Sequence, residues 1–286
     1  MHWLVDLSLR DDRLRQIKDA LDKTSSSHTY FGLTTEEHTF TGIDYDIFNQ
    51  HDNFIALSYI NAIKICTTDE FTKHNLYKFE SLSEKEINNV MSKMRKSFFY
   101  DDDKKFDQFY YSNLGLPLLN DKPIFISLIG QEELTFDTEK FIKPSKDLKA
   151  FTGGLIQPHQ TIKDFVEKGR YQAGWNEEIA LISEVKEIEA EYRFFVLDDK
   201  VITGSRYILN KEVIPSPIVP KDVLDVADEY AKLYKPHDLF TMDIAVMKNG
   251  EYKIVEYNAF NGSGHYECDL VKLFSVLNEV YKNKAL

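Results

Sequence analysis

The sequence has few of the residues that cross-link or stiffen a small fold. Its two cysteines, Cys66 and Cys268, are far apart and lack a C-x-x-C partner, so neither a disulfide framework nor a thiolate zinc site is predicted. This cysteine usage is typical of a reducing compartment. Only 12 glycines and 8 prolines occur among 286 residues, which excludes a collagen-like chain and a Pro-rich linker protein. A hydrophobic content of 43% is enough for a folded core of one large or two modest domains.

Long apolar runs and an excess of positive charge are also missing. No stretch comes near the length of about 18 apolar residues that a membrane span requires. The opening residues reach an acidic side chain at Asp6, so we expect no export signal and a cytoplasmic protein. Forty-seven acidic against 35 basic residues give a net charge of −12, which disfavours a broad grip on nucleic acid or anionic lipid. Nucleic acid is therefore the weakest partner hypothesis, although the lysines of segment 85–105 allow a local basic patch.

The first part of the chain predicts an α/β unit but little chemistry. Its expected elements are strands at 3–5 and 54–60 and helices at 9–21 and 84–96. A Leu-Gly-Leu-Pro sequence at 114–117 breaks whatever precedes it. We therefore expect an N-terminal domain of residues 1–118 and a second domain of residues 119–286.

The second part contains a clear hairpin pattern. Apolar strands at 240–246 and 251–258 flank Asn249-Gly250, the dipeptide typical of a two-residue type I′ turn. Such a turn would put three pairs on one face of the sheet: Ala245 with Ile254, Asp243 with Glu256 and Thr241 with Asn258.

The facing acids of this hairpin require a compensating charge. Two carboxylates directly opposite each other on neighbouring strands repel. Asp243, Glu256 and Asn258 offer the oxygen ligands that Mg²⁺ prefers, so the pattern predicts a magnesium site. A solvated acidic pair on an exposed face is the alternative.

A second hairpin is predicted at 191–197 and 200–207, around Asp198-Asp199. In the register of a two-residue turn, Glu191 opposes Arg206 and Arg193 opposes Gly204, so both arginines and the acid share a face. The chain has only seven arginines, three of them after residue 118, and two lie here. Guanidinium groups suit phosphate oxygens and the charge that develops in phosphoryl transfer. An ordinary surface Glu–Arg pair is the alternative.

Three weaker signals precede these hairpins. Lys143 ends a short apolar run, the loop 149–154 closes on Gly153-Gly154, and a strand at 178–185 runs to Glu184. Backbone N–H groups of a glycine loop can approach phosphate. Each signal alone is equally typical of an ordinary strand end or turn.

In this order, the segments FIKPS, KAFTGG, ISEVKEIEAEYRFFV, SRY and MDIAVMKNGEYKIVEYNAFNGSGHY resemble the ATP-grasp superfamily. They are most similar to a clade of phage and bacterial ATP-grasp proteins named for two arginines and a lysine. The resemblance covers residues 119–286. It implies an α+β protein with an α/β-like N-terminal part and an ATP-grasp fold, in which two sheet-bearing subdomains clasp ATP.

The resemblance also implies roles for individual residues. Lys143 would meet the nucleotide phosphates, Gly153 and Gly154 would close over them, Glu184, Val185 and Lys186 would contact adenine, and Glu191 would take the ribose hydroxyls. Arg193 and Arg206 would face the γ-phosphate or acyl phosphate, and Asp243, Glu256 and Asn258 would hold Mg²⁺. Lys149 and Lys186 compete for the place of a second, hinge-strand lysine.

The implied activity is an ATP- and Mg²⁺-dependent ligation of a carboxylate to an amine through an acyl phosphate, with release of ADP. The substrates would be small molecules or peptides. His265 is a candidate proton acceptor for the amine, and a bystander role is its alternative. Two other readings stay open: a kinase that phosphorylates a small molecule, and a nucleotide-binding module without turnover.

Overall fold

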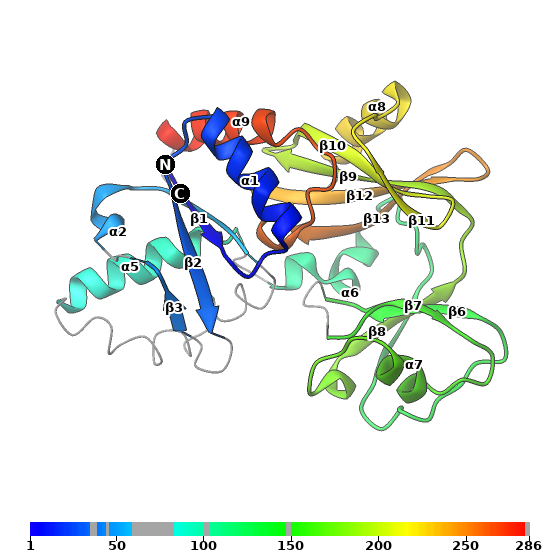
Figure 1. The fold of residues 1–286 in the computed structure, drawn as a ribbon. Coiled ribbons are helices and arrows are strands. Elements are labelled where there is room, and N and C mark those ends of the chain that lie inside the picture. Colours follow the sequence, from blue (N-terminus) through cyan, green and yellow to red (C-terminus); the bar gives the residue numbers. More distant parts are fainter. Residues whose placement is uncertain (35–38, 44–45, 59–82, 100–102, 147–149, 284–286) are drawn as a thin grey trace.

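The structure is a computed structural model that describes residues 1–34, 39–43, 46–58, 83–99, 103–146 and 150–283. Three β-sheets and the helices around them make an α+β protein (Figure 1). None of the helices described there is both long and apolar enough to cross a lipid bilayer.

The first sheet has the strand order β3-β2-β1-β4. Its strands are β1 (His2–Asp6), β2 (His28–Thr34), β3 (Thr39–Thr41) and β4 (Phe54–Leu57), and the helices beside it are α1 (Asp11–Lys23), α2 (Ile47–Gln50) and α5 (Glu84–Lys96). Strands β2, β1 and β4 are parallel, and the whole of β1 is buried, as expected of a parallel strand covered on both faces. The predicted strands and helices of this part are confirmed, except that residues 59–60 lie outside the described residues.

The second sheet has the order β5-β8-β6-β7 and carries one small core. Its strands are β5 (Ile124–Ser127), β6 (Lys140–Pro144), β7 (Gly154–Ile156) and β8 (Ile179–Glu184). Short helical segments border it: η2 (Asp103–Phe106), α6 (Gln108–Tyr111), η3 (Ser112–Leu114), α7 (Ile162–Lys168) and η4 (Trp175–Glu177). Helix α7 packs on this sheet through Ile162 and Val166, and the side-chain oxygen of Thr161 caps its first turn.

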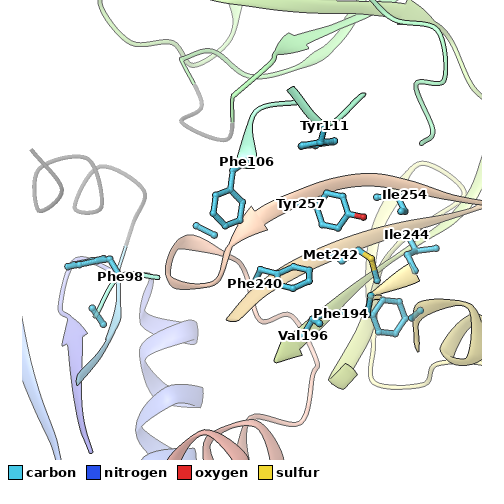
Figure 2. Close-up of a cluster of buried hydrophobic side chains, with 14 of the residues drawn as sticks. Phe98, Phe106, Tyr111, Phe194, Val196, Phe240, Met242, Ile244, Ile254 and Tyr257 are labelled. Carbon is cyan, nitrogen blue, oxygen red and sulfur yellow. The ribbon is translucent and has the colours of Figure 1, made fainter. Parts of the chain in front are cut away.

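The third sheet is antiparallel and has the order β11-β10-β9-β12-β13. Its elements are β9 (Ile188–Leu197), β10 (Lys200–Leu209), β11 (Glu212–Ser216), α8 (Lys221–Tyr230), β12 (Leu239–Met247), β13 (Tyr252–Ala259), η5 (Phe260–Gly262) and α9 (Leu270–Asn283). One face packs against α8 through side chains such as Phe194, Met242 and Ile244 (Figure 2). The other face meets α9 at one end and carries polar side chains at the other.

Side chains from both ends of the chain share these cores. Phe98 and Phe106 belong to the same cluster as Phe194 and Tyr257 (Figure 2). Helices α1 and α9 lie side by side in Figure 1 and are in contact. The division into domains 1–118 and 119–286 stays a prediction, and both parts contribute side chains to one hydrophobic core.

Asn261 ties the end of β13 to the first sheet. Its buried side-chain amide donates hydrogen bonds to the backbone oxygens of Ala56 in β4 and Ser97 after α5, the latter at 3.0 Å. Its own backbone oxygen accepts from the N–H of Ser58 at 3.2 Å. The strand that carries Glu256 and Asn258 is therefore anchored at its far end by the N-terminal part.

The β12–β13 register brings the candidate metal ligands together. Two of the three predicted pairs are confirmed, Asp243 with Glu256 and Thr241 with Asn258. The third is wrong, because Ala245 lies opposite Lys253.

The turn between these strands explains that mixed outcome. The N–H of Gly250 donates to the oxygen of Met247 at 2.8 Å, and the N–H of Met247 donates to the oxygen of Glu251 at 2.8 Å, so the loop has three residues. Gly250 has a φ of +85°, and Asn249 is not among the positive-φ residues, so the type I′ prediction is wrong. A bulge then leaves Val255 unpaired and restores the predicted register at Glu256.

Candidate active site

A cavity of about 790 Å³ lies between the second and third sheets. Its walls include nine of the predicted site residues: Lys143, Gly153, Gly154, Glu184, Val185, Lys186, Glu191, Glu256 and Asn258. Arg193 and Asp243 are buried behind this wall, and Lys149 lies outside the described residues. A cavity of this size is within the range of small-molecule sites.

Strand β6 and the glycine loop form one wall. Phe141, Lys143 and Ser145 are alternate residues of β6 and its continuation, and all three line the cavity. Gly153 passes so close that a Cβ there would lie 2.7 Å from the Cβ of Lys143 and 3.2 Å from the oxygen of Ile142. Only glycine fits such an approach, so the loop holds Lys143 close to its backbone.

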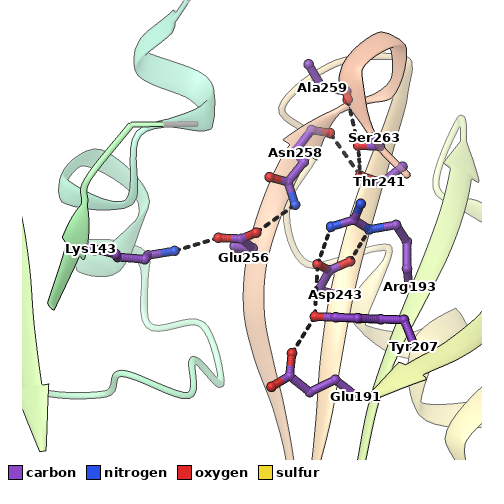
Figure 3. Close-up of polar contacts among 10 residues, drawn as sticks. All are labelled: Lys143, Glu191, Arg193, Tyr207, Thr241, Asp243, Glu256, Asn258, Ala259 and Ser263. Carbon is purple, nitrogen blue, oxygen red and sulfur yellow. Dashed lines mark hydrogen bonds and ion pairs between the residues drawn. The ribbon is translucent and has the colours of Figure 1, made fainter. Parts of the chain in front are cut away.

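Lys143 reaches across the cavity to the third sheet. Its Nζ lies 2.7 Å from Oε2 of Glu256, and Oε1 of Glu256 accepts a hydrogen bond from Nδ2 of Asn258 at 3.1 Å (Figure 3). Burial alone would raise the pKa of Glu256, but the charge and hydrogen bond of Lys143 lower that pKa to about 2. Glu256 is therefore an ionised ligand at neutral pH.

Asp243 has a different cationic partner. Arg193 lies opposite it on β9 and forms a two-pronged contact, with Nε–Oδ1 at 2.7 Å and Nη2–Oδ2 at 2.6 Å (Figure 3). Burial raises the pKa of Asp243, and the guanidinium of Arg193 counteracts part of that rise. The repulsion expected between Asp243 and Glu256 is thus compensated by two side chains, one for each carboxylate.

Glu191 lies in the same acidic cluster. Its Oε2 accepts a hydrogen bond from the hydroxyl of Tyr207, which also lies 3.3 Å from Oδ2 of Asp243 (Figure 3). Burial and the charges of Asp243 and Glu256 raise the pKa of Glu191 to about 7, against the lowering effect of the Tyr207 hydrogen bond. Three carboxylates therefore face two cations, Arg193 and Lys143, at this end of the cavity.

Arg206 does not join the cluster, which corrects the predicted shared face. The Asp198-Asp199 turn has two residues as predicted, with φ values of +46° and +65°. Two bulges in β10 then shift the register, so Arg193 opposes Ser205, and Arg206 opposes Tyr192 on the other face. Nε of Arg206 donates to the oxygen of Ile214 at 3.3 Å.

The segment from Glu184 to Lys186 lies at the edge of the cavity. Oε1 of Glu184 pairs with Nζ of Lys140 at 2.5 Å, and Nζ of Lys186 pairs with Oδ1 of Asp121 at 3.0 Å. Both side chains are engaged outside the acidic cluster. The segment offers its backbone and Val185 to the cavity, whereas Lys186 points to Asp121.

His265 is placed where it cannot accept a proton. The Nε of Arg13 in α1 donates to its Nδ1 at 3.3 Å, so the ring carries its hydrogen on Nε2. Burial and the charges of Arg13 and Arg193 hold the pKa of His265 well below its usual value. The ring stacks on Phe195. The bystander alternative therefore fits this histidine.

Tyr207, Tyr266 and Arg13 were missed at the sequence level. Tyr207 and Tyr266 lie within the SRY and GHY segments already singled out, beside residues that attracted attention as an arginine and a histidine. No local signal connects Arg13 with the loop at Ser263, whose oxygen accepts from its Nη2 at 2.7 Å.

The donor set fits a hard divalent cation. Asp243, Glu256 and Asn258 can each present an oxygen atom, and a carboxylate oxygen that accepts one hydrogen bond keeps a second lone pair. Within the described part of the chain, no group of three or more His, Cys, Asp or Glu side chains has metal-binding geometry. The amide of Asn258 would therefore be the third protein ligand.

Comparisons with known proteins identify relatives of this chain. Residues 122–276 match a family described as an ATP-grasp domain, the second family of its clade. Among solved structures, the D-cycloserine synthetase DcsG is similar with a TM-score of 0.55 at 10% identity, over 98% of this chain and 99% of that one. D-alanine–D-alanine ligase from Bacillus anthracis gives 0.54 at 14% identity, over 97% and 92%.

A third structure extends the likeness in fold. The ATP-grasp ligase PsnB, complexed with a minimal precursor, gives a TM-score of 0.51 at 11% identity, over 97% of this chain and 98% of that one. No curated protein matches the sequence. The shared fold covers nearly the whole of each chain, including the part before residue 122.

Proposed function

Because the chain belongs to this second clade family of the ATP-grasp domains, we propose that it is an ATP- and Mg²⁺-dependent ligase that joins a carboxylate to an amine. The observation that carries the proposal is the acidic cluster of Glu191, Asp243 and Glu256. Among the described residues, these three carboxylates face two cations at the wall of a cavity. An excess of negative charge there favours a dication and the phosphates it brings.

The nucleotide would lie along β6. Its adenine would contact the segment 184–186, and its phosphates would lie at Lys143 and beneath Gly153. Mg²⁺, when bound by Asp243, Glu256 and Asn258, would neutralise charge on the β- and γ-phosphates. Lys143 would then exchange Glu256 for a phosphate oxygen, since its ammonium already points into the cavity.

The reaction would proceed in two transfers. A carboxylate oxygen of the first substrate attacks the γ-phosphorus, the bond to the β,γ-bridging oxygen breaks, and ADP leaves. The amine of the second substrate then attacks the acyl carbon, phosphate departs, and an amide remains after loss of a proton from nitrogen. Arg193 would stabilise the charge on the transferring group while its contact with Asp243 keeps the guanidinium in place.

The proposal is tested by calorimetric titration of the protein with ATP, with and without Mg²⁺. We expect Mg²⁺ to strengthen ATP binding in the natural protein and to have at least tenfold less effect in Glu256→Gln, because a charged ligand is lost. Thermal unfolding of both proteins checks that the variant folds. Absence of magnesium-assisted binding in the natural protein would refute the proposal.

The reaction class is tested by ADP release. Mg-ATP is incubated with mixtures of small carboxylates, peptides and amines, and products are followed by mass. We expect ADP and an amide that forms only when both a carboxylate and an amine are present. A stable phosphorylated product that forms without any amine would instead identify a kinase.

A further inference from the structure

A bulge in β10 turns one tyrosine onto the face of the acidic cluster. Ser205 pairs with Arg193 and Arg206 pairs with Tyr192, but the next pair joins Ile208 to Glu191. Tyr207 is therefore an extra residue with no partner across the ladder. Bulges of this kind change the direction of a side chain and are common beside active sites.

The hydroxyl of Tyr207 lies between carboxylates from two different strands. It donates to Oε2 of Glu191 on β9 and lies 3.3 Å from Oδ2 of Asp243 on β12. Burial and these two negative charges raise the pKa of Tyr207 well above its usual value, so the hydroxyl keeps its proton. A phenol has a single proton to donate, so this one hydroxyl holds the two carboxylates at a fixed separation.

The ring of Tyr207 confines the guanidinium. It stacks on Tyr266 with centroids 4.8 Å apart and an angle of 14° between the planes. The Cζ of Arg193 lies 5.6 Å from the Tyr207 centroid and 5.5 Å from the Tyr266 centroid. Tyr266 has a φ of +48°, an unusual conformation for an aromatic residue that places its ring in this stack.

We propose that Tyr207 is a positioning residue for the phosphate- and metal-binding cluster. Its hydroxyl fixes Glu191 against Asp243, and its ring, together with Tyr266, fixes Arg193. The proposal rests on the proposed function and adds to it a residue that acts through three others. Removal of the hydroxyl alone would leave the packing intact and would free both carboxylates to change position.

The test compares Tyr207→Phe with the natural protein, with Mg²⁺ titrated at a fixed concentration of ATP in the calorimeter. We expect the apparent affinity for Mg²⁺ to fall about tenfold, because one hydrogen bond to a charged group is lost. We expect the affinity for ATP without Mg²⁺ and the thermal midpoint to stay close to those of the natural protein. A residue that only packs would not separate these readouts.

Tyr252→Phe is the matched control. The hydroxyl of Tyr252 donates to Oδ2 of Asp222 at 2.5 Å, an exposed tyrosine–carboxylate contact on the same sheet and away from the cavity. This variant should bind Mg²⁺ and ATP as the natural protein does. Tyr266→Leu is the second variant, because it removes the stack and keeps the Tyr207 hydroxyl. It should weaken the binding of Mg-ATP about tenfold through Arg193.

The outcomes separate the two proposals. If the natural protein binds Mg-ATP while Tyr207→Phe and Tyr266→Leu bind it equally well, the positioning role is overturned and the proposed function stands. If Tyr252→Phe shows the same loss as Tyr207→Phe, the effect is not specific to the cluster and the positioning role is again overturned. If the natural protein binds no Mg-ATP, the proposed function fails, and this inference fails with it.

Discussion

Replacement of Glu191 by glutamine should stabilise the protein at high pH and not at low pH. Glutamine has the same shape and can still accept the hydroxyl hydrogen bond of Tyr207, but it carries no charge to bury. The pKa of Glu191 rises from 4.5 to about 7 on folding, chiefly through burial. Each tenfold change in proton affinity is worth about 1.4 kcal/mol, so the ionised carboxylate destabilises the fold by about 3 kcal/mol.

The sign of this effect follows from proton linkage. Below pH 4.5 the carboxyl is protonated in both states and costs nothing. Between 4.5 and about 7 the unfolded chain releases the proton first, so the stability of the natural protein falls as the pH rises. The stability advantage of Glu191→Gln should therefore grow by about 2.5 kcal/mol between pH 5 and pH 8.

Urea unfolding of both proteins at pH 5, 6, 7 and 8 measures this difference directly. Glu189→Gln is the control, because Glu189 is exposed and lies two residues earlier on the same strand. Its advantage over the natural protein should not change with pH by more than about 0.5 kcal/mol. If the Glu191→Gln difference is equally flat, the carboxylate is not held in the buried cluster, and the account of its charge is wrong.

Two further substitutions probe the same walls. Arg193→Lys keeps the charge but loses the two-pronged contact with Asp243, so the free energy of unfolding should fall by about 1–3 kcal/mol in urea titrations, against less than about 1 kcal/mol for Arg206→Gln. Gly153→Ala should weaken Mg-ATP binding about tenfold in the calorimeter, because its Cβ would displace Lys143. Gly154→Ala should have a smaller effect, since its Cβ would meet only Phe165 at 3.4 Å.

The strands and their order along the chain were predictable from the sequence, because alternation and turn residues act locally. The helix at 84–96 was predicted with its observed bounds, and Ser83 and Glu86 form a capping box at its start. The pairing of Asp243 with Glu256 was predicted for an incomplete reason. A three-residue loop and an unpaired Val255 shift the register in opposite directions, so the two errors cancel.

The partners of the charged residues were not predictable. A bulge is set by how a strand packs against its neighbours, so the sequence alone favoured Arg206 over Tyr207 for the site face. The contact of Lys143 with Glu256 joins residues of two different sheets, and no spacing in the chain reports such a distance. The sequence therefore indicated most of the ionisable groups around the cavity, and tertiary packing decided which of them meet.

The anchoring of Asn261 has a practical consequence for experiments on fragments. The family match starts at residue 122, which invites expression of the later part of the chain alone. Such a fragment would lack the backbone oxygens of Ala56 and Ser97 and would leave a fully buried amide without these acceptors. The strand with Glu256 and Asn258 would then end in a loose segment, so weak magnesium binding by a truncated protein would reflect a missing support and not a missing ligand.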